Sequence, residues 1–150
     1  MIYLGADHRG YKLKEELKGW LVSRGCDVTD LGNDKYDRDD DFVDFAIRLG
    51  QRVVRDGQRG VLVCGSGVGM AVAANKVGGV RAGVLTSGRQ ARIAREEDDI
   101  NIACLGADFM TTEEAKEVVE IFVETLFLSE ERYVKRIQKI KNYEKKCCQN

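Results

Sequence analysis

The chain has 150 residues, and its 24 Lys and Arg residues nearly balance its 25 Asp and Glu residues, for a formal net charge of −1. This length predicts one domain over residues 1–150 that buries about two thirds of its unfolded surface. Interspersed charges of both signs argue against a nucleic-acid surface and against an anionic-membrane surface. No apolar run approaches the roughly 20 residues of a membrane span, and the chain opens on a strand rather than a signal peptide, so we expect a cytoplasmic protein.

Strand and helix patterns alternate along the whole chain. Short apolar runs mark the strands, and apolar residues at helical spacing, closed by glycines or capping residues, mark the helices. In order, the expected elements are a strand at 2–6, a helix between Gly10 and Gly25, a strand at 27–31, an acidic loop at 33–41, a helix from Phe42 to Gly57, a strand at 61–64, a helix after Gly69, a strand at 80–85, a helix after Ser87, a strand at 100–105, a helix after Thr111 that keeps its period to Leu126, and a final helix over about 131–146.

This alternation predicts an α/β fold, a three-layer α/β/α sandwich with a five-stranded parallel sheet of Rossmann-like type. Two helix starts carry capping-box residues, Ser87 with Gln90 and Thr111 with Glu114. In such sheets ligands gather beyond the carboxyl ends of the strands. We therefore expect Asp7, His8 and the segment after Cys64 to share one rim.

The cysteine and histidine content limits which metal sites and redox reactions the chain can support. His8 is the one histidine, and the cysteines form an odd set without a C-x-x-C spacing: Cys26, Cys64, Cys104, Cys147 and Cys148. These residues offer no set of four ligands for a zinc ion. We expect a reduced protein that holds no metal and needs no cofactor.

The most informative segment runs from Val61 to Met70 and reads Val-Leu-Val-Cys-Gly-Ser-Gly-Val-Gly-Met. A buried strand ends at Cys64, and glycines at three alternate positions lead into a helix. Such a loop can converge backbone N–H groups on an anion, and a thiol beside it gains thiolate character. The loop thus predicts a base or nucleophile next to an oxyanion cradle. The alternative is that Cys64 is simply a small buried apolar residue.

Three known phosphate- or nucleotide-binding loops do not match this segment. A nucleotide P-loop ends in Gly-Lys-Ser/Thr, whereas Met70 and Ala71 follow the last glycine here. A dinucleotide fingerprint requires an acidic residue about 20 positions on, where this chain has Val84-Leu85-Thr86. A thiol phosphatase needs an arginine to hold the phosphoryl group, and Met70 stands in its place.

Five segments together resemble the type B ribose-5-phosphate isomerase family, which also contains the galactose-6-phosphate isomerase subunits. They are Gly5–Lys14, Cys64–Met70, Ala73–Lys76, Val80–Ala82 and the pair Arg132 and Arg136. The resemblance runs from Ile2 to about Ile140 and implies a metal-independent aldose–ketose isomerase of a sugar phosphate that works through a cis-enediolate. It also implies a homodimer, or a dimer of dimers, in which the C-terminal helix extends to the partner and active sites are shared.

The resemblance assigns a role to each candidate residue. Cys64 is the proton-carrying base, Asp7 assists ring opening, and the remaining groups bind the enediolate oxygens, the sugar or its phosphate: Ser66, Gly65, Gly67, Val68, Gly69, His8, Asp41, Asn101, Arg132 and Arg136. Some of these residues also have an ordinary structural explanation. Asp7 can instead cap the first helix, His8 can be a turn residue, and the two arginines can form a solvated basic face.

Three departures from the family pattern concern sugar recognition. The ring-opening histidine of the family is Glu97 here, the arginine of its Leu-Gly-Ala-Arg segment is Asp108, and its Asp-Tyr-Pro-Asp segment reads Asp41-Phe42-Val43-Asp44. Three hypotheses follow. The chain isomerises ribose 5-phosphate or a hexose 6-phosphate with Glu97 transferring the proton, it isomerises an acyclic substrate such as a tetrose phosphate, or it binds a sugar phosphate without turnover.

Overall fold

Strands and helices alternate along residues 1–147, the part of the chain that the computed structural model describes. The strands are β1 (Ile2–Ala6), β2 (Val28–Asp30), β3 (Arg59–Cys64), β4 (Ala82–Val84) and β5 (Ile102–Gly106). The helices are α1 (Tyr11–Ser23), α2 (Phe42–Asp56), α3 (Val68–Ala74), α4 (Gly88–Asp98), α5 (Thr112–Glu124) and α6 (Glu131–Cys147). Cys148 lies outside the described residues.

All strand pairs are parallel, and the sheet order is β2-β1-β3-β5-β4. The predicted five-stranded parallel sheet is thereby confirmed. The chain leaves β1 toward β2 on one side and reaches β3 on the other, so the order reverses between β1 and β3. Ligands bind at such a switch point, beyond the carboxyl ends of the strands.

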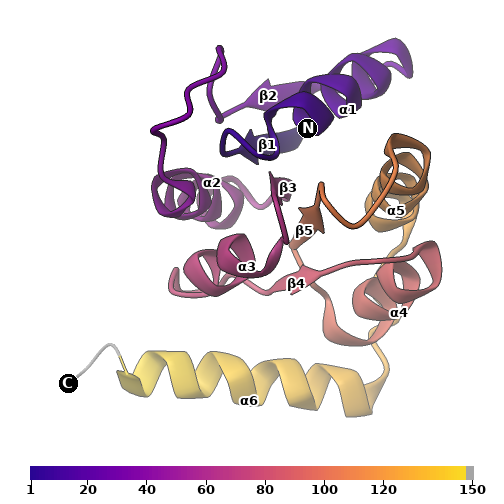
Figure 1. Ribbon diagram of the computed structural model, residues 1–150. Coiled ribbons are helices and arrows are strands. Elements are labelled where there is room, and N and C mark those ends of the chain that lie inside the picture. Colours follow the sequence, from indigo (N-terminus) through magenta and orange to yellow (C-terminus); the bar gives the residue numbers. More distant parts are fainter. Residues whose placement is uncertain (148–150) are drawn as a thin grey trace.

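Helices cover both faces of the sheet, with α2 and α3 on one side and α1, α4 and α5 on the other (Figure 1). Successive residues of a strand face opposite layers, so Leu62 packs against α2 while Val61 and Val63 pack toward α1 and α5. Each fully buried side chain of this size contributes about 1.5–3 kcal/mol. Cys64 faces the α2 and α3 layer, where Cys104 of the neighbouring strand also lies.

Helix α6 lies outside the sandwich and runs beneath α3 and α4 (Figure 1). Its inner face buries Tyr133 and Ile137, and at its far end the Glu144 carboxylate accepts from the Gly79 N–H at 3.2 Å. Its outer face leaves apolar side chains exposed, including Ile140 at 47% and Tyr143 at 70%. Within residues 1–147, no helix has both the length and the apolar character needed to cross a membrane.

Two helix ends differ from the sequence expectation. Ser87 caps α4 as predicted, but the Gln90 side chain accepts from the N–H of Thr86 at 2.8 Å instead of closing the box on Ser87. The Thr111 and Glu114 capping box is complete. Helix α5 ends at Glu124, so the helical period predicted through Leu126 was wrong for its last two residues.

The reason for the early end is a set of contacts with α4. The carbonyl of Thr125 accepts from Arg95 Nε at 3.3 Å, and the N–H of Leu128 donates to the carbonyl of Glu96 at 3.1 Å. These bonds draw the chain out of the helix in an extended conformation, and Leu126 is left 74% exposed.

Candidate active site

The carboxyl ends of β1, β3 and β5 lie side by side and form the rim on which the predicted loop sits. Ala6 pairs with Val63, and Cys64 pairs with Gly106. Two backbone bonds then fix the loop to the segment after β5: Ala107 N donates to the Cys64 carbonyl at 2.8 Å, and Asp108 N donates to the Gly65 carbonyl at 3.0 Å. The loop is therefore a rigid part of the sheet end.

The three loop glycines are required for different reasons. Gly67 has a φ of 78°, the left-handed region that side chains disfavour, and a Cβ there would also lie 3.1 Å from the carbonyl carbon of Leu105. Gly69 instead leaves room for Phe42 at the start of α2, whose ring a Cβ would approach to 2.9 Å. Gly65 leaves room for the guanidinium of Arg9. Only Gly67 needs the positive φ that the sequence analysis offered for all three.

Cys64 lies at the end of β3 with 5% of its surface exposed. Its Sγ accepts a hydrogen bond from the N–H of Gly67 at 3.1 Å, which ties the side chain into the loop. The hydroxyl of Ser66, an exposed residue, accepts from the N–H of Val68 at 3.3 Å. Two of the predicted oxyanion donors are thus engaged within the loop.

Asp7 and His8 follow β1 on the same rim, as expected. Asp7 is 6% exposed and accepts from the N–H of Gly10 at 3.0 Å, which holds the turn into α1. Burial raises the pKa of the Asp7 carboxyl. The N-cap of α1 is Gly10, which has no side-chain cap, so the capping role considered for Asp7 was wrong, and its role in ring opening stays a prediction.

The structure adds Asp40 to this group. One oxygen of Asp40 lies 2.7 Å from His8 Nδ1 and accepts the His8 backbone N–H at 3.0 Å, while its other oxygen accepts from Asn33 Nδ2 at 2.5 Å. These bonds orient the imidazole. The acidic loop at 33–41 therefore supports His8. Its neighbour Asp41 caps α2 by accepting from Val43 N at 2.9 Å.

Arg9 and Asp108 are further rim residues that sequence reasoning did not place together. The Arg9 guanidinium pairs with the Asp108 carboxylate and lies directly against Gly65. The two residues are 99 positions apart in the chain, so no local pattern could join them.

The other four candidates lie toward the amino-terminal ends of the strands, opposite the rim. They are Asn101, Glu97, Arg132 and Arg136. Asn101 precedes β5 and is level with Arg59, five residues before the register position of Cys64, or roughly 17 Å along the strand. Its side chain accepts from Arg81 N at 2.8 Å and donates to the Gly79 carbonyl at 2.9 Å, so it holds the turn before β4.

Glu97, Arg132 and Arg136 gather around the Tyr133 ring of α6. The guanidinium carbons of Arg132 and Arg136 lie 4.4 and 5.9 Å from the ring centroid. Burial raises the pKa of the Tyr133 phenol, and the neighbouring Glu97 carboxylate raises it further against the opposing effect of Arg132. The two predicted phosphate arginines therefore share one site with Glu97, away from Cys64.

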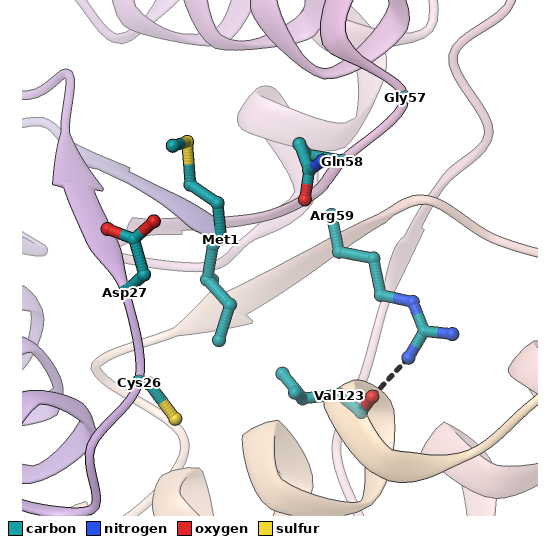
Figure 2. A pocket seen from close by; sticks show the side chains of 8 residues that line it. Met1, Cys26, Asp27, Gly57, Gln58, Arg59 and Val123 are labelled. Carbon is teal, nitrogen blue, oxygen red and sulfur yellow. Dashed lines mark hydrogen bonds between the residues drawn. The ribbon is translucent and has the colours of Figure 1, made fainter.

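Surface hollows lie at both ends of the strands. One of about 330 Å³ lies at the amino-terminal ends of the strands, where Met1, Asp27 and Arg59 surround it and Arg59 donates to the Val123 carbonyl (Figure 2). Another of about 280 Å³ lies on the rim between α1 and α5, lined in part by Arg9 and Asp108. In residues 1–147 no group of three His, Cys, Asp or Glu side chains is arranged to hold a metal ion.

Comparisons with known proteins agree with this architecture. The chain matches the Ribose/Galactose Isomerase family over residues 2–140. It is 38% identical to the probable ribose-5-phosphate isomerase B of Mycoplasma genitalium, covering 96% of this chain and 95% of that protein, and 38% identical to ribose-5-phosphate isomerase B of Mycobacterium tuberculosis, covering 96% and 90%.

The crystal structure of the Mycoplasma genitalium enzyme with bound ribulose 5-phosphate superimposes with a TM-score of 0.92, covering 96% of this chain and 95% of that chain. The resemblance that the sequence motifs indicated is thereby confirmed over nearly the whole chain. The protein belongs to the ribose/galactose isomerase family.

Proposed function

We propose that this isomerase interconverts ribose 5-phosphate and ribulose 5-phosphate through a cis-enediolate, with Cys64 as the base. The observation that carries the proposal is the Cys64 loop: a thiol at a strand end, held by the Gly67 N–H, beside further amides and the exposed Ser66. Its relatives from Mycoplasma genitalium and Mycobacterium tuberculosis are named as ribose-5-phosphate isomerases, and the former was solved with ribulose 5-phosphate.

The reaction requires one proton to move between two carbons. The Cys64 thiolate takes the proton from C2 of the open aldose, the C2–H electron pair forms the C1–C2 double bond, and negative charge develops on the sugar oxygens. The thiol then returns the proton to C1 while the proton of the C2 hydroxyl passes to the C1 oxygen, so that C2 becomes the carbonyl carbon of the ketose. A base must lie within reach of the proton that it takes, and the end of β3 places the Cys64 sulfur beside the loop amides proposed to hold the sugar oxygens.

The loop amides stabilise the enediolate oxygens. The proposed donors are the N–H groups of Gly65, Gly67, Val68 and Gly69, and those of Gly67 and Val68 bond Cys64 Sγ and the Ser66 hydroxyl in the free protein. Donors fixed by the fold at the point where charge develops are usually the largest single contribution to such catalysis. The anchoring of the loop to the end of β5 keeps these donors in place.

A second copy of the chain completes the site in this proposal. Glu97, Arg132 and Arg136 lie at the far edge of the sheet and cannot reach a sugar held at Cys64 of the same chain. A symmetric pair of chains brings the α6 edge of one copy against the rim of the other. Exposed apolar residues of α6, such as Ile140 and Tyr143, support such an interface. The assembly is a homodimer or a pair of dimers.

An acyclic substrate such as a tetrose phosphate is the second candidate, and the observation that favours it is Glu97. This carboxylate stands where the family pattern has its ring-opening histidine, and Asp7, the other candidate for ring opening, already holds the turn to Gly10. A sugar that needs no ring opening makes both groups dispensable. A hexose 6-phosphate is the third substrate class to test.

Proton exchange separates these substrates. The purified protein is incubated in deuterated water with tetrose, pentose and hexose phosphates, and deuterium at the exchanging carbon is followed by NMR. We expect exchange with ribose 5-phosphate. Exchange with the tetrose phosphate alone favours the acyclic candidate, and a faster reaction of cyclic sugars after Glu97→His supports it further. No exchange with any aldose phosphate contradicts the proposed function.

A further inference from the structure

Arg9 has an unusual position at the rim. Its guanidinium lies flat against the backbone of Gly65, the residue that follows the candidate base, and pairs with Asp108 from the end of β5. The Arg9 side chain is 57% exposed and that of Asp108 is 44% exposed. A guanidinium carries five N–H donors, which is more than the one contact with Asp108 uses.

Two other charged groups of the rim, Asp40 and Asp7, hold neighbouring residues of the rim. The Asp40 carboxylate holds His8 and Asn33, and Asp7 holds Gly10. Arg9 is thus an exposed cation beside the Cys64 loop, and its one ion-pair partner among the described residues is Asp108. The rim hollow of about 280 Å³ extends from Arg9 past Lys12, and the Glu16 carboxylate within it accepts the Thr112 hydroxyl.

We propose that Arg9 binds the phosphate of the substrate and that Asp108 is a positioning residue that holds Arg9 over Gly65. This inference rests on the proposed function and identifies a binding group that the sequence analysis did not include. Bidentate contact between guanidinium and phosphate gives both affinity and orientation, so Arg9 fixes the distance between the phosphate and the carbons at Cys64.

The two partners of the pair are then expected to have opposite effects on the Michaelis constant. Arg9→Gln removes the cation and raises KM for ribose 5-phosphate about ten- to one-hundred-fold, with a smaller effect on kcat. Asp108→Asn keeps an acceptor for the guanidinium but removes the charge that repels phosphate, so KM falls by roughly two- to fivefold. A pair that serves only the fold would leave KM unchanged in both variants and lower the melting temperature in both.

A matched control lies at the other end of α1. Arg24 at the end of α1 also forms an exposed ion pair with another element, through Glu120 of α5, but lies far from the rim. Arg24→Gln is expected to leave KM unchanged. Inorganic phosphate serves as an independent probe: its inhibition constant and its thermal stabilisation of the protein should weaken in Arg9→Gln and persist in Arg24→Gln.

The outcomes separate the two proposals. Turnover with unchanged KM and phosphate inhibition in Arg9→Gln overturns the role of Arg9 and leaves the proposed function standing. A wild-type protein that lacks turnover, yet loses phosphate binding on Arg9→Gln, contradicts the proposed function and supports the role of Arg9. If turnover is absent and phosphate stabilises wild type and Arg9→Gln equally, both proposals fail.

Discussion

The two ends of the parallel strands hold their candidate functional residues in different ways. At the rim, backbone hydrogen bonds join the Cys64 loop to Ala107 and Asp108, and side chains from segments far apart in sequence hold His8 and Arg9. At the opposite end of the strands, Arg132 and Arg136 are exposed side chains of α6 that surround Tyr133, and the Leu128 N–H bond to the Glu96 carbonyl ties the segment before α6 to α4.

In the proposed mechanism, this difference divides the work of the protein. The rim carries the groups that need fixed geometry, the proposed base and its oxyanion donors, because small displacements there are costly to catalysis. The α6 end carries long cationic side chains that we propose meet the phosphate of a sugar held on another surface. Under this proposal one chain holds two halves of a site, and association of two chains joins them.

The largest expected effect comes from mixing two inactive variants. Cys64→Ala destroys the rim half, and Arg132→Gln combined with Arg136→Gln destroys the α6 half, so each protein alone is inactive. In co-expressed mixed dimers one of the two sites has both halves intact. Equal random mixing should then restore about a quarter of wild-type activity. Mixtures as inactive as either parent would show that the halves do not belong to one shared site.

The rigidity of the rim can be tested at Gly67. Gly67 and Gly25 have the same φ of 78°, but a Cβ at Gly25 meets nothing within 4 Å, whereas at Gly67 it meets the Leu105 carbonyl. We expect Gly25→Ala to lower the free energy of unfolding by about 1 kcal/mol and Gly67→Ala by about 2–4 kcal/mol, with loss of turnover.

Chemical denaturation measures both values, and Gly78→Ala, which has open space and no positive φ, should change stability by less than about 0.5 kcal/mol. Equal losses at Gly67 and Gly25 would mean that the contact between the loop and β5 adds nothing to stability.

A smaller effect is expected at Asp7. Because burial raises the pKa of this carboxyl in the folded protein, the folded state disfavours its charged form, and stability decreases as pH rises through that pKa. Asp7→Asn keeps an oxygen for the Gly10 N–H and removes the charge. The variant should therefore melt higher than wild type at pH 7, and the difference should vanish below the ordinary carboxyl pKa of 3.8.

Thermal melts between pH 3 and pH 8 check this expectation. A constant difference in melting temperature across the range would show that ionisation of Asp7 is not its cause. Slower reaction of cyclic sugars, with acyclic sugars unaffected, would in addition assign Asp7 to ring opening.

Much of this molecule could be predicted from local patterns. The alternating strands and helices, the Thr111 cap and the Cys64 loop are encoded by neighbouring residues, so periodicity and glycine spacing reveal them. The position of β4 outside β5 could not be predicted this way, because strand order depends on contacts between distant segments.

The same limit applies to the site. The supports of the rim join residues 32 positions apart, as for His8 and Asp40, or 99 apart, as for Arg9 and Asp108. No periodic pattern spans such distances. The separation of Glu97 from Cys64 follows from the packing of the helices on the sheet. A helix that follows a parallel strand carries the chain back to the amino-terminal ends of the strands.

The central claim is that Cys64 carries the proton. The most direct measurement is deuterium incorporation from solvent into ribose 5-phosphate, compared between wild type, Cys64→Ala and Cys104→Ala. Cys104 is a matched thiol on the neighbouring strand, where burial raises its pKa and it stays neutral. We expect Cys104→Ala to exchange at nearly the wild-type rate and Cys64→Ala to lose exchange while still binding phosphate. Exchange by Cys64→Ala at the wild-type rate would contradict the account.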